Sequence, residues 1–288
     1  MTLVPSPGIS LPSFEPGAHI ELTLGAVTRR YSLTSRPDSP VSYEICVLRT
    51  RPSRGGSAFI HDSLKVDDTL EVSAPINAFP LDARAEHSVF IAGGIGITPF
   101  IPMIIALRSE GRSFDLHYSA RSLDRLVPVP EAANRLHTYI GESGPPRLSV
   151  PSLLETYDPS DSVYVCGPRS LIEAVRCHAE ILGWSRENVR FESFGSSIEA
   201  TDAPVTVKLA RSRLTVDVQP GTSILDALLE NGVWATYECH RGECASCAVT
   251  FLSGEADHRD VCLTASQRRT TFCTCVSWAR SSEITLDL

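Results

Sequence analysis

Short apolar runs broken by Pro, Gly and Ser follow one another along the first part of the chain. They predict strands at His19–Leu24, Arg30–Leu33, Tyr43–Leu48 and Thr69–Ser73. Strands this short and this closely spaced are typical of a small antiparallel β barrel or sandwich. We therefore predict an all-β domain over residues 1–84.

The pattern changes at Ser88, where strands begin to alternate with helices. A strand over Val89–Ala92 leads into Gly93 and Gly94, and a helix is expected over Pro99–Arg108. Further strands are expected at Phe114–Ser119 and Ser162–Val165, and a further helix at Ser170–Leu182. This alternation predicts a parallel α/β sheet, which we assign to residues 85–195.

A small, polar stretch over residues 196–203 predicts a linker to a third domain at 204–288. Val205–Leu209 and Leu214–Val218 predict a hairpin there. Ser223–Asn231 predicts a short helix that Ser223 caps and Gly232 ends. With a last strand expected at Glu283–Leu288, this region is predicted to be an α+β domain.

One apolar stretch approaches the length of a membrane span. His87–Leu107 holds no Asp, Glu, Lys or Arg over 21 residues. It also holds three glycines and two prolines, which fit a strand, a glycine turn and a helix start better. We therefore expect a buried α/β segment and no membrane partner.

The charge composition also bears on which binding partners are expected. Lys and Arg total 26 against 34 Asp and Glu, a net charge of −8, so nucleic acid and anionic membranes are poor partners. The segment Met1–Pro5 lacks the basic and long apolar parts of a signal peptide. We expect a cytoplasmic protein.

The nine cysteines change this picture most. An odd number without a secretion signal argues against a disulfide framework, and six of the nine lie between Cys239 and Cys275. Cys239-x4-Cys244-x2-Cys247, followed by Cys275 after 27 intervening residues, is the plant-type spacing of a 2Fe–2S cluster. Thiolates are soft ligands, and three on one loop plus one from a distant strand enclose two irons.

Other interpretations of these cysteines stay open. A structural zinc site favours two paired C-x2-C units, and this chain has one. Reduced cysteines packed in a core need no metal. Cys273 competes with Cys275 for the fourth ligand position, because residues two apart on a strand face the same side. Cys262 is expected to be a packed residue.

Two loops in the α/β domain follow buried strands and open helices. They are Gly93–Thr98, where Thr98 is expected to cap the helix that Pro99 begins, and Cys166–Pro168. Glycines let a cofactor approach the backbone, and helix N-termini offer N–H groups to phosphate. Either loop alone fits ordinary strand–helix packing. Two of them at strand C-termini predict the crevice in which α/β sheets bind nucleotides.

Arginine is concentrated in the β domain. The segment over residues 29–54 contains only two acidic residues, Asp38 and Glu44, but six arginines, at positions 29, 30, 36, 49, 51 and 54. Arginine suits phosphate, and Tyr31, Ser32 and the turn Gly55–Ser57 add hydroxyl and N–H donors. A solvated basic face is the alternative for an arginine run taken alone. Together with the rest of the chain, the pattern favours a flavin phosphate site.

These motifs together resemble the ferredoxin-reductase flavoprotein superfamily. They are Arg30-Tyr31-Ser32-Leu33-Thr34, Gly55-Gly56-Ser57, Gly93–Pro99 and Cys166-Gly167-Pro168. With a plant-type ferredoxin segment at the C-terminus, the chain is similar to the phthalate dioxygenase reductase group, which includes the vanillate O-demethylase reductases. The resemblance covers nearly the whole chain. It implies an FMN-binding antiparallel β barrel, an NAD-binding α/β domain and a β-grasp ferredoxin domain.

The resemblance also implies a role for each matched position. FMN would be held by Arg30, Tyr31, Ser32, Leu33, Thr34, Gly55, Gly56 and Ser57. The nicotinamide and pyrophosphate path would be lined by Gly94, Gly96, Thr98, Gly167 and Pro168. Catalytic positions near the reacting rings would be Thr34, Cys166 and Phe194. The cluster would be bound by Cys239, Cys244, Cys247 and Cys275, since Cys275-Val276-Ser277 fits the family's fourth-ligand context better than Cys273 does.

Two departures from the family pattern stand out. Members carry a longer segment, with the barrel's first strand, before the stretch matched by Phe14–His19, so the first strand is expected to be missing and a strand edge exposed. Ala245 stands in the cluster loop where a glycine is common.

The function implied is that of an oxygenase reductase. NADH would reduce FMN, and single electrons would pass through the 2Fe–2S cluster to a partner Rieske-type aromatic oxygenase or demethylase. NADPH is the alternative donor, because Arg121 is suited to its 2′-phosphate. We expect a monomer. The rival function is a non-catalytic ferredoxin-like electron carrier or redox sensor with an impaired flavin domain, and a zinc-stabilised binding module is a third.

Overall fold

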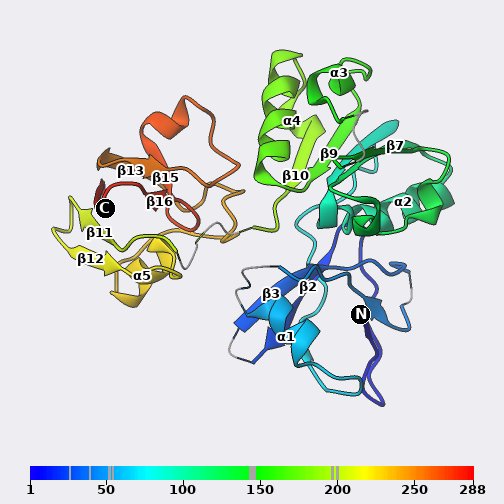
Figure 1. Cartoon of the computed structure of the whole chain (residues 1–288), viewed down its shortest axis with the longest axis horizontal. Coiled ribbons are helices and arrows are strands. Elements are labelled where there is room, and N and C mark those ends of the chain that lie inside the picture. Colours follow the sequence, from blue (N-terminus) through cyan, green and yellow to red (C-terminus); the bar gives the residue numbers. More distant parts are fainter. Residues whose placement is uncertain are drawn as a thin grey trace. The chain divides into compact units, whose positions relative to one another are not determined.

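The computed structural model describes residues 1–25, 27–38, 40–50, 53, 55–142, 147–195, 198 and 201–288. The chain divides into two compact units, Met1–Glu192 and Ser193–Leu288 (Figure 1). The predicted flavin and nucleotide domains share the first unit, and the predicted ferredoxin domain forms most of the second. Within the predicted linker, residues 196, 197, 199 and 200 lie outside the described residues. The predicted domain boundaries stay predictions.

Two small antiparallel sheets make up the β region of the first unit. One has the order β3 (Val27–Ser32), β2 (His19–Leu24), β5 (Glu71–Val72), and the other pairs β1 (Thr2–Leu3) with β4 (Tyr43–Glu44). A bridge between Leu33 and Ile45 joins them, and both side chains are buried in a shared core with Ile20 and Leu22. The predicted antiparallel β domain is confirmed. Strand β1 is already paired, and whether a further strand belongs before it stays a prediction.

Five parallel strands form the second sheet of this unit. Their order is β10 (Val189–Glu192), β9 (Ser162–Cys166), β6 (His87–Gly93), β7 (Ser113–Ala120), β8 (Leu136–Ile140). The predicted parallel α/β sheet is therefore confirmed, although β8 and β10 were not predicted. The strand order reverses between β6 and β9, which makes this pair the topological switch point where such sheets bind ligands.

Helices cover this parallel sheet. They are α2 (Phe100–Ser109), preceded by the 3-10 turn η1 (Gly94–Ile97), α3 (Val150–Leu154) and α4 (Arg169–Ile181), with short 3-10 turns at Leu123–Arg125, Pro130–Ala132 and Arg186–Asn188. Phe100 and Met103 of α2 are buried against Phe90, Tyr118 and Tyr164 of the strands. Helix α4 packs on β9 and β10 (Figure 1).

The apolar stretch His87–Leu107 thus forms β6, η1 and most of α2, as predicted. Among the described residues, no helix has both the length and the apolar character needed to cross a membrane.

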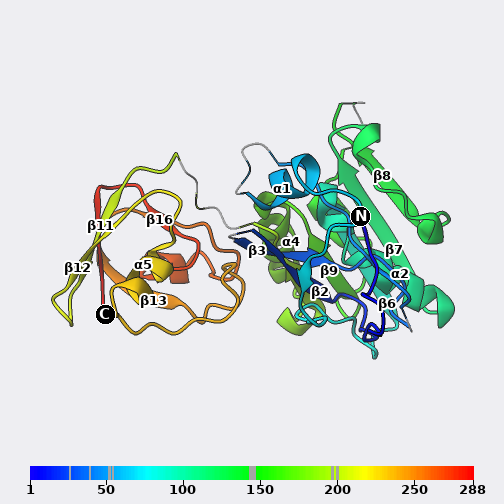
Figure 2. The same ribbon diagram turned by 90° about the horizontal axis from the view of Figure 1, so that it is seen from below.

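The second unit has a β-grasp fold, as predicted. Its main sheet has the order β12 (Thr215–Val218), β11 (Val205–Leu209), β17 (Glu283–Leu286), β13 (Ala248–Ser253), β15 (Thr271–Cys273). Helix α5 (Ile224–Glu230) packs against β12 (Figure 2), and Ser223 caps it by accepting a 2.9 Å hydrogen bond from the Asp226 N–H. A small sheet of β14 (Ala256–Asp257) and β16 (Trp278–Ala279) and a 3-10 turn at Gln267–Arg269 complete the unit.

Candidate functional site

Backbone N–H groups point at sulfur in the loop between α5 and β13. The N–H groups of Arg241 and Glu243 each donate to Cys239 Sγ over 3.4 Å, and the Ser246 N–H donates to Cys244 Sγ over 3.4 Å. Such bonds stabilise a thiolate, which is the form of cysteine that binds metal. The loop is therefore folded to present anionic sulfur.

Left-handed backbone makes this folding possible. His240, Gly242 and Ala245 have φ angles of +54°, +69° and +60°. A Cβ on Gly242 would also lie 2.6 Å from Val276 Cγ2 and 2.9 Å from Asp260 Cα, so only glycine fits there. Ala245, the departure noted in the sequence, carries its methyl group in the region that glycine prefers.

Four cysteine sulfurs converge in this loop. Cys247 Sγ and Cys275 Sγ, 28 residues apart in sequence, lie 3.1 Å from one another. Cys239 and Cys244 hydrogen bond to each other, and Cys239 is near enough to Cys275 to interact with it electrostatically. Thr274 joins the segment of Cys275 to that of Cys247, because its N–H and its hydroxyl both donate to the Cys247 carbonyl, at 3.3 and 3.2 Å.

The structure favours Cys275 over Cys273 as the fourth member of this group. Strand β15 ends at Cys273 and the chain turns at once, so the two side chains do not continue one strand face. Both thiols hydrogen bond to Cys247, but Cys275 also interacts with Cys239, whereas Cys273 Sγ lies 3.7 Å from Cys262 Sγ. The assignment of the ligands themselves stays a proposal.

Charge at these sulfurs suits a metal cluster. Hydrogen bonds from Cys273 and Cys275 lower the pKa of the Cys247 thiol to about 3, and the same contact with Cys247 raises the pKa of Cys275. One buried thiolate is thus surrounded by thiols that lose their protons when a cation binds. Four cysteine thiols with this sequence spacing fit a 2Fe–2S cluster.

The two predicted nucleotide loops meet at the switch point of the parallel sheet. A Cβ on Gly96 would lie 2.3 Å from the Cys166 carbonyl oxygen, and one on Gly167 would lie 2.8 Å from Gly93 Cα. Glycine is needed at both positions because the loops touch. Gly94 differs, since it has a φ of +56° and a Cβ there would have no neighbour within 4 Å among the described residues. Its backbone faces open space, as a nucleotide path requires.

The predicted capping of α2 is wrong. The Thr98 hydroxyl donates to the Ile95 carbonyl over 3.1 Å and caps nothing, and Pro99 is the residue before the helix rather than its first. The turn η1 runs directly into α2, and Thr98 and Pro99 both have helical backbone conformation, whereas a capping residue has extended backbone.

The three predicted catalytic side chains have different surroundings. Cys166 is fully buried in the core of the α/β region. Thr34 is half-buried, and its N–H donates to the Glu44 carbonyl over 2.8 Å. Phe194 is 40% exposed and belongs to the second unit, so its contact with rings bound in the first unit stays a prediction.

In the predicted flavin site, the structure groups Arg29 rather than Arg30 with the other residues. A Cβ on Gly56 would lie 2.6 Å from Arg29 Cγ and 3.3 Å from Tyr31 Oη, whereas Arg30 Nε lies 2.8 Å from Glu21 Oε1. Residues two apart on a strand share a face, so Arg29 and Tyr31 both point toward α1 (Gly56–Asp62). The alternation of side chains along a strand, counted back from Tyr31, indicates Arg29 as the arginine on the same face.

The remaining predicted flavin positions contribute mainly to packing. Leu33 and Ser32 are buried, and the Ser57 hydroxyl lies 2.8 Å from Thr50 Oγ1. Gly55, with a φ of +91°, forms the predicted turn and leads into α1, a helix that the sequence did not predict. Among the other arginines, Arg49 pairs with Asp62, while positions 51 and 54 lie outside the described residues.

Comparison with known proteins agrees with this geometry. Residues 207–280 match the family model described as a 2Fe-2S iron-sulfur cluster binding domain. The chain is 37% identical over 295 residues to the phthalate dioxygenase reductase of Burkholderia cepacia, covering 98% of this chain and 90% of that one. The chain belongs to the phthalate dioxygenase reductase family.

Other known proteins are about as similar to this chain. The beta subunit of the heme-dependent oxidative N-demethylase of Ectopseudomonas mendocina (strain ymp) is 38% identical, with 97% of this chain and 91% of that one covered. One longer relative is matched over 50% of its length. A solved phthalate dioxygenase reductase, described as a modular structure for electron transfer from pyridine nucleotides to 2Fe–2S, superposes with a TM-score of 0.75 at 36% identity, over 100% of this chain and 92% of that one. This member of the family is an oxidoreductase with a 2Fe–2S-binding domain.

Proposed function

We propose that this member of the phthalate dioxygenase reductase family takes electrons from NADH in its first unit and delivers them singly, from the 2Fe–2S cluster, to a Rieske-type oxygenase or demethylase that acts on an aromatic substrate. The observation that carries the proposal is the four-sulfur group of Cys239, Cys244, Cys247 and Cys275 in a chain that also has glycine loops at a sheet switch point.

A group that exchanges both electron pairs and single electrons is needed between these two sites. When bound, FMN supplies this exchange, because a flavin takes up a hydride equivalent and releases its electrons one at a time. Arg29, Tyr31 and Gly56 would hold it. The side chains of Arg29 and Tyr31 lie on one face of β3, where Gly56 of α1 comes close to both. Arg30 is a second candidate for binding FMN, but its guanidinium already pairs with the Glu21 carboxylate.

The loops after β6 and β9 would bind the nucleotide. Gly96 and Gly167 bring the loops together, Pro168 fixes the start of α4, and the backbone at Gly94 is left open to the ligand. Cys166 would act through its backbone, since its side chain is buried. NADH is the proposed donor, and Arg121, exposed just after β7, makes NADPH the comparison to run beside it.

The surface near the cluster loop supports a protein as electron acceptor. Trp234 is 81% exposed and Tyr237 is 49% exposed, both within a few residues of Cys239. Aromatic residues are enriched in protein interfaces, and large ones are rarely left in water without a partner. A net charge of −8 and nine cysteines without a disulfide support a cytoplasmic chain that binds neither nucleic acid nor membrane, and we propose that it works as a monomer.

An anaerobic visible spectrum of the purified protein, taken before and after NADH, tests the proposal. Flavin and iron–sulfur bands that both bleach are the expected result. Iron–sulfur absorbance that NADH and NADPH leave unchanged, even after FMN is added, would contradict it and favour an electron carrier or redox sensor. Zinc without iron would favour a binding module. Reduced protein should then reduce a Rieske oxygenase faster than a heme-dependent one, and the opposite order would reassign the partner.

A further inference from the structure

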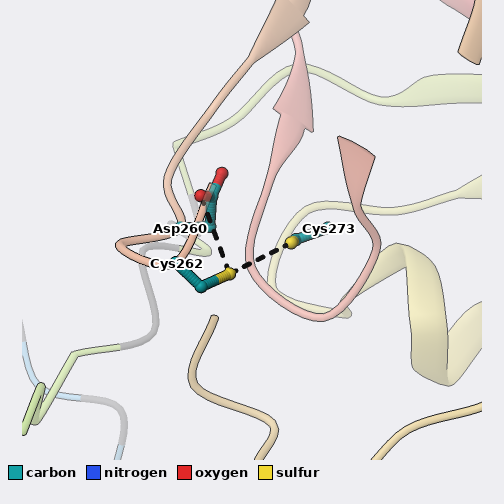
Figure 3. A group of neighbouring side chains, drawn as sticks. All are labelled: Asp260, Cys262 and Cys273. Carbon is teal, nitrogen blue, oxygen red and sulfur yellow. Dashed lines mark hydrogen bonds between the residues drawn. The ribbon is translucent and has the colours of Figure 1, made fainter. Parts of the chain in front are cut away.

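Three metal-binding side chains outside the proposed ligand set lie together beside the cluster loop. They are Asp260, Cys262 and Cys273, and one donor atom from each lies within 4.8 Å of the others (Figure 3). Cys262 Sγ is 3.7 Å from Cys273 Sγ and 3.9 Å from Asp260 Oδ2. Figure 3 shows the two sulfurs pointing toward each other from separate segments, the loop after β14 and the end of β15.

The spacing of the two sulfurs fits a shared metal ion. With metal–sulfur bonds of about 2.3 Å and tetrahedral angles, two sulfurs on one zinc ion lie roughly 3.7 Å apart. The observed separation of Cys262 Sγ and Cys273 Sγ is 3.7 Å. It is too long for a disulfide, whose sulfurs are about 2.05 Å apart.

Asp260 adds an independent observation. Its side chain is fully buried, and Oδ2 accepts the Leu263 N–H at 2.9 Å and lies 3.4 Å from Arg268 Nη2. The other oxygen, Oδ1, has no hydrogen-bond partner among the described residues, and His258 Nδ1 is 3.8 Å away. A buried carboxylate oxygen with an unused lone pair is costly unless something binds it.

Charge is also balanced when a divalent cation binds. Two thiolates and one carboxylate carry three negative charges, and Arg268 supplies one positive charge nearby. A divalent ion brings the group to neutrality, with the two thiol protons released on binding. Sulfur donors select zinc or a similar thiophilic ion over magnesium or calcium.

We propose that Asp260, Cys262 and Cys273 bind one thiophilic divalent cation, zinc in the first instance, next to the 2Fe–2S cluster. Cys262 is half-buried, so the ion enters from its side and a water fills the fourth position. The ion joins the loop after β14 to the end of β15. Because Cys273 also hydrogen bonds to Cys247, the bound cation lies one sulfur away from a proposed cluster ligand.

Zinc content of the holoprotein tests this site. Protein with the iron content of a full cluster is freed of loose metal on a chelating resin, incubated with excess Zn²⁺, desalted and analysed for both metals. We expect one zinc per chain in the wild type, and Cys262→Ser or Asp260→Asn should weaken zinc binding at least about 10-fold. Cys177→Ser removes an exposed cysteine of α4 in the other unit and is the matched control, expected to bind zinc as the wild type does.

The reduction potential of the cluster provides a second readout. Zinc on Cys273 replaces the thiol proton that this residue shares with Cys247, so zinc should shift the potential in the wild type and leave it unchanged in Cys262→Ser. Equal zinc in the wild type and Cys262→Ser would show adventitious binding and overturn the proposal. Zinc gained only as iron is lost would place it in the cluster site and overturn it too. So would a Cys262–Cys273 disulfide in anaerobically prepared protein that excludes zinc, because the pair would then be a redox couple.

Discussion

The cluster loop and the nucleotide loops of this chain are built in opposite ways. At the cluster, side chains form the site, because two pairs of cysteine sulfurs, Cys239 with Cys244 and Cys247 with Cys275, lie near each other. At the switch point of the parallel sheet, the absence of side chains forms the site, since Gly96 and Gly167 let two loops touch and Gly94 leaves its backbone open. The first site is therefore destroyed by removing a side chain, and the second by adding one.

Cys275→Ser tests the first half of this comparison and has the largest expected effect. Serine offers a harder oxygen in place of a soft thiolate, so iron binding should fall and electron delivery to a one-electron acceptor should drop about 100-fold or more. Iron analysis and stopped-flow reduction measure both. Reduction of FMN by NADH should persist, because the first unit is unchanged. Full iron retention would mean that Cys273 takes the ligand position.

Gly96→Ala tests the second half. The new methyl carbon would lie 2.3 Å from the Cys166 carbonyl oxygen, so the loops must separate. We expect a loss of about 1–3 kcal/mol in the free energy of unfolding and a fall of about 100-fold in kcat/KM for NADH. Gly141→Ala is the control, since its nearest neighbour would be 3.7 Å away and the change should stay within about 0.5 kcal/mol. Equal effects in the two variants would refute the argument from loop contact.

Arg29→Ala and Arg30→Ala sharpen the comparison at the flavin site, where side chains and a glycine act together. Loss of Arg29, which lies beside Gly56 and Tyr31, should weaken FMN binding about 10- to 100-fold. Loss of Arg30 breaks a surface pair with Glu21 and should change FMN affinity by no more than about 3-fold. Fluorescence titration of the FMN-free protein gives both affinities. The reverse order would restore Arg30 to the site.

The two units should also differ in how their stability depends on pH, because the first unit contains a buried histidine. His117 Nδ1 lies 2.9 Å from Tyr139 Oη and His117 Nε2 lies 2.7 Å from Tyr157 Oη, which in turn donates to Asp115 Oδ2. Burial, with a smaller effect of the stacked His137 and against the opposing effect of Asp115, lowers the pKa of His117 from 6.5 to about 4. The network therefore holds a neutral imidazole.

The first unit should consequently lose stability as the pH falls from 6.5 toward 4. The unfolded state binds a proton on His117 in this range and the folded state does not, so the loss grows with each pH step and amounts to about 3 kcal/mol at most. Hydrogen exchange followed by mass spectrometry resolves the first unit from the second. His117→Asn, which cannot titrate, should flatten this dependence, and a wild-type profile that is already flat would argue against the buried neutral imidazole.

Ala245→Gly is expected to have the smallest effect, and a favourable one. Its φ of +60° costs an alanine about 1 kcal/mol that a glycine avoids. The temperature at which the cluster absorbance is lost should rise by a few degrees. This corresponds to a gain of roughly 0.5–1 kcal/mol in the free energy of unfolding, once the greater conformational entropy of glycine in the unfolded chain is subtracted. Ala248→Gly, at the start of β13, should instead lower that temperature.

The sequence predicts the parts of this molecule whose chemistry or period is local. The cysteine spacing, the glycine loops and strands such as His19–Leu24 could all be read from adjacent residues. Strand β8 could not, because His137 and Thr138 are polar and exposed and the other side chains of this short strand are only partly buried. Helix α1 was hidden by Gly55 and Gly56, which suggested only a turn.

Within the sites, the failures concern orientation. The choice between Arg29 and Arg30 depends on which face of β3 meets α1, and the pairing of Cys262 with Cys273 depends on how a distant loop folds back. Thr98 was expected to cap because its residue type suits a cap, but η1 continues directly into α2. Residue type and spacing indicate what a group can do, and only the fold decides which partner it has.

The cluster cysteines are also part of a hydrophobic core. Cys247 and Cys275 are buried with Leu225, Leu263 and Val276. If these cysteines bind the cluster as proposed, iron would be a component of the interior of the second unit, and metal binding would be part of its folding free energy. Chains made while iron is scarce would be poorly folded and open to proteolysis. The amount of this reductase in a cell should then follow the iron supply at the level of protein lifetime, whatever the rate of its synthesis.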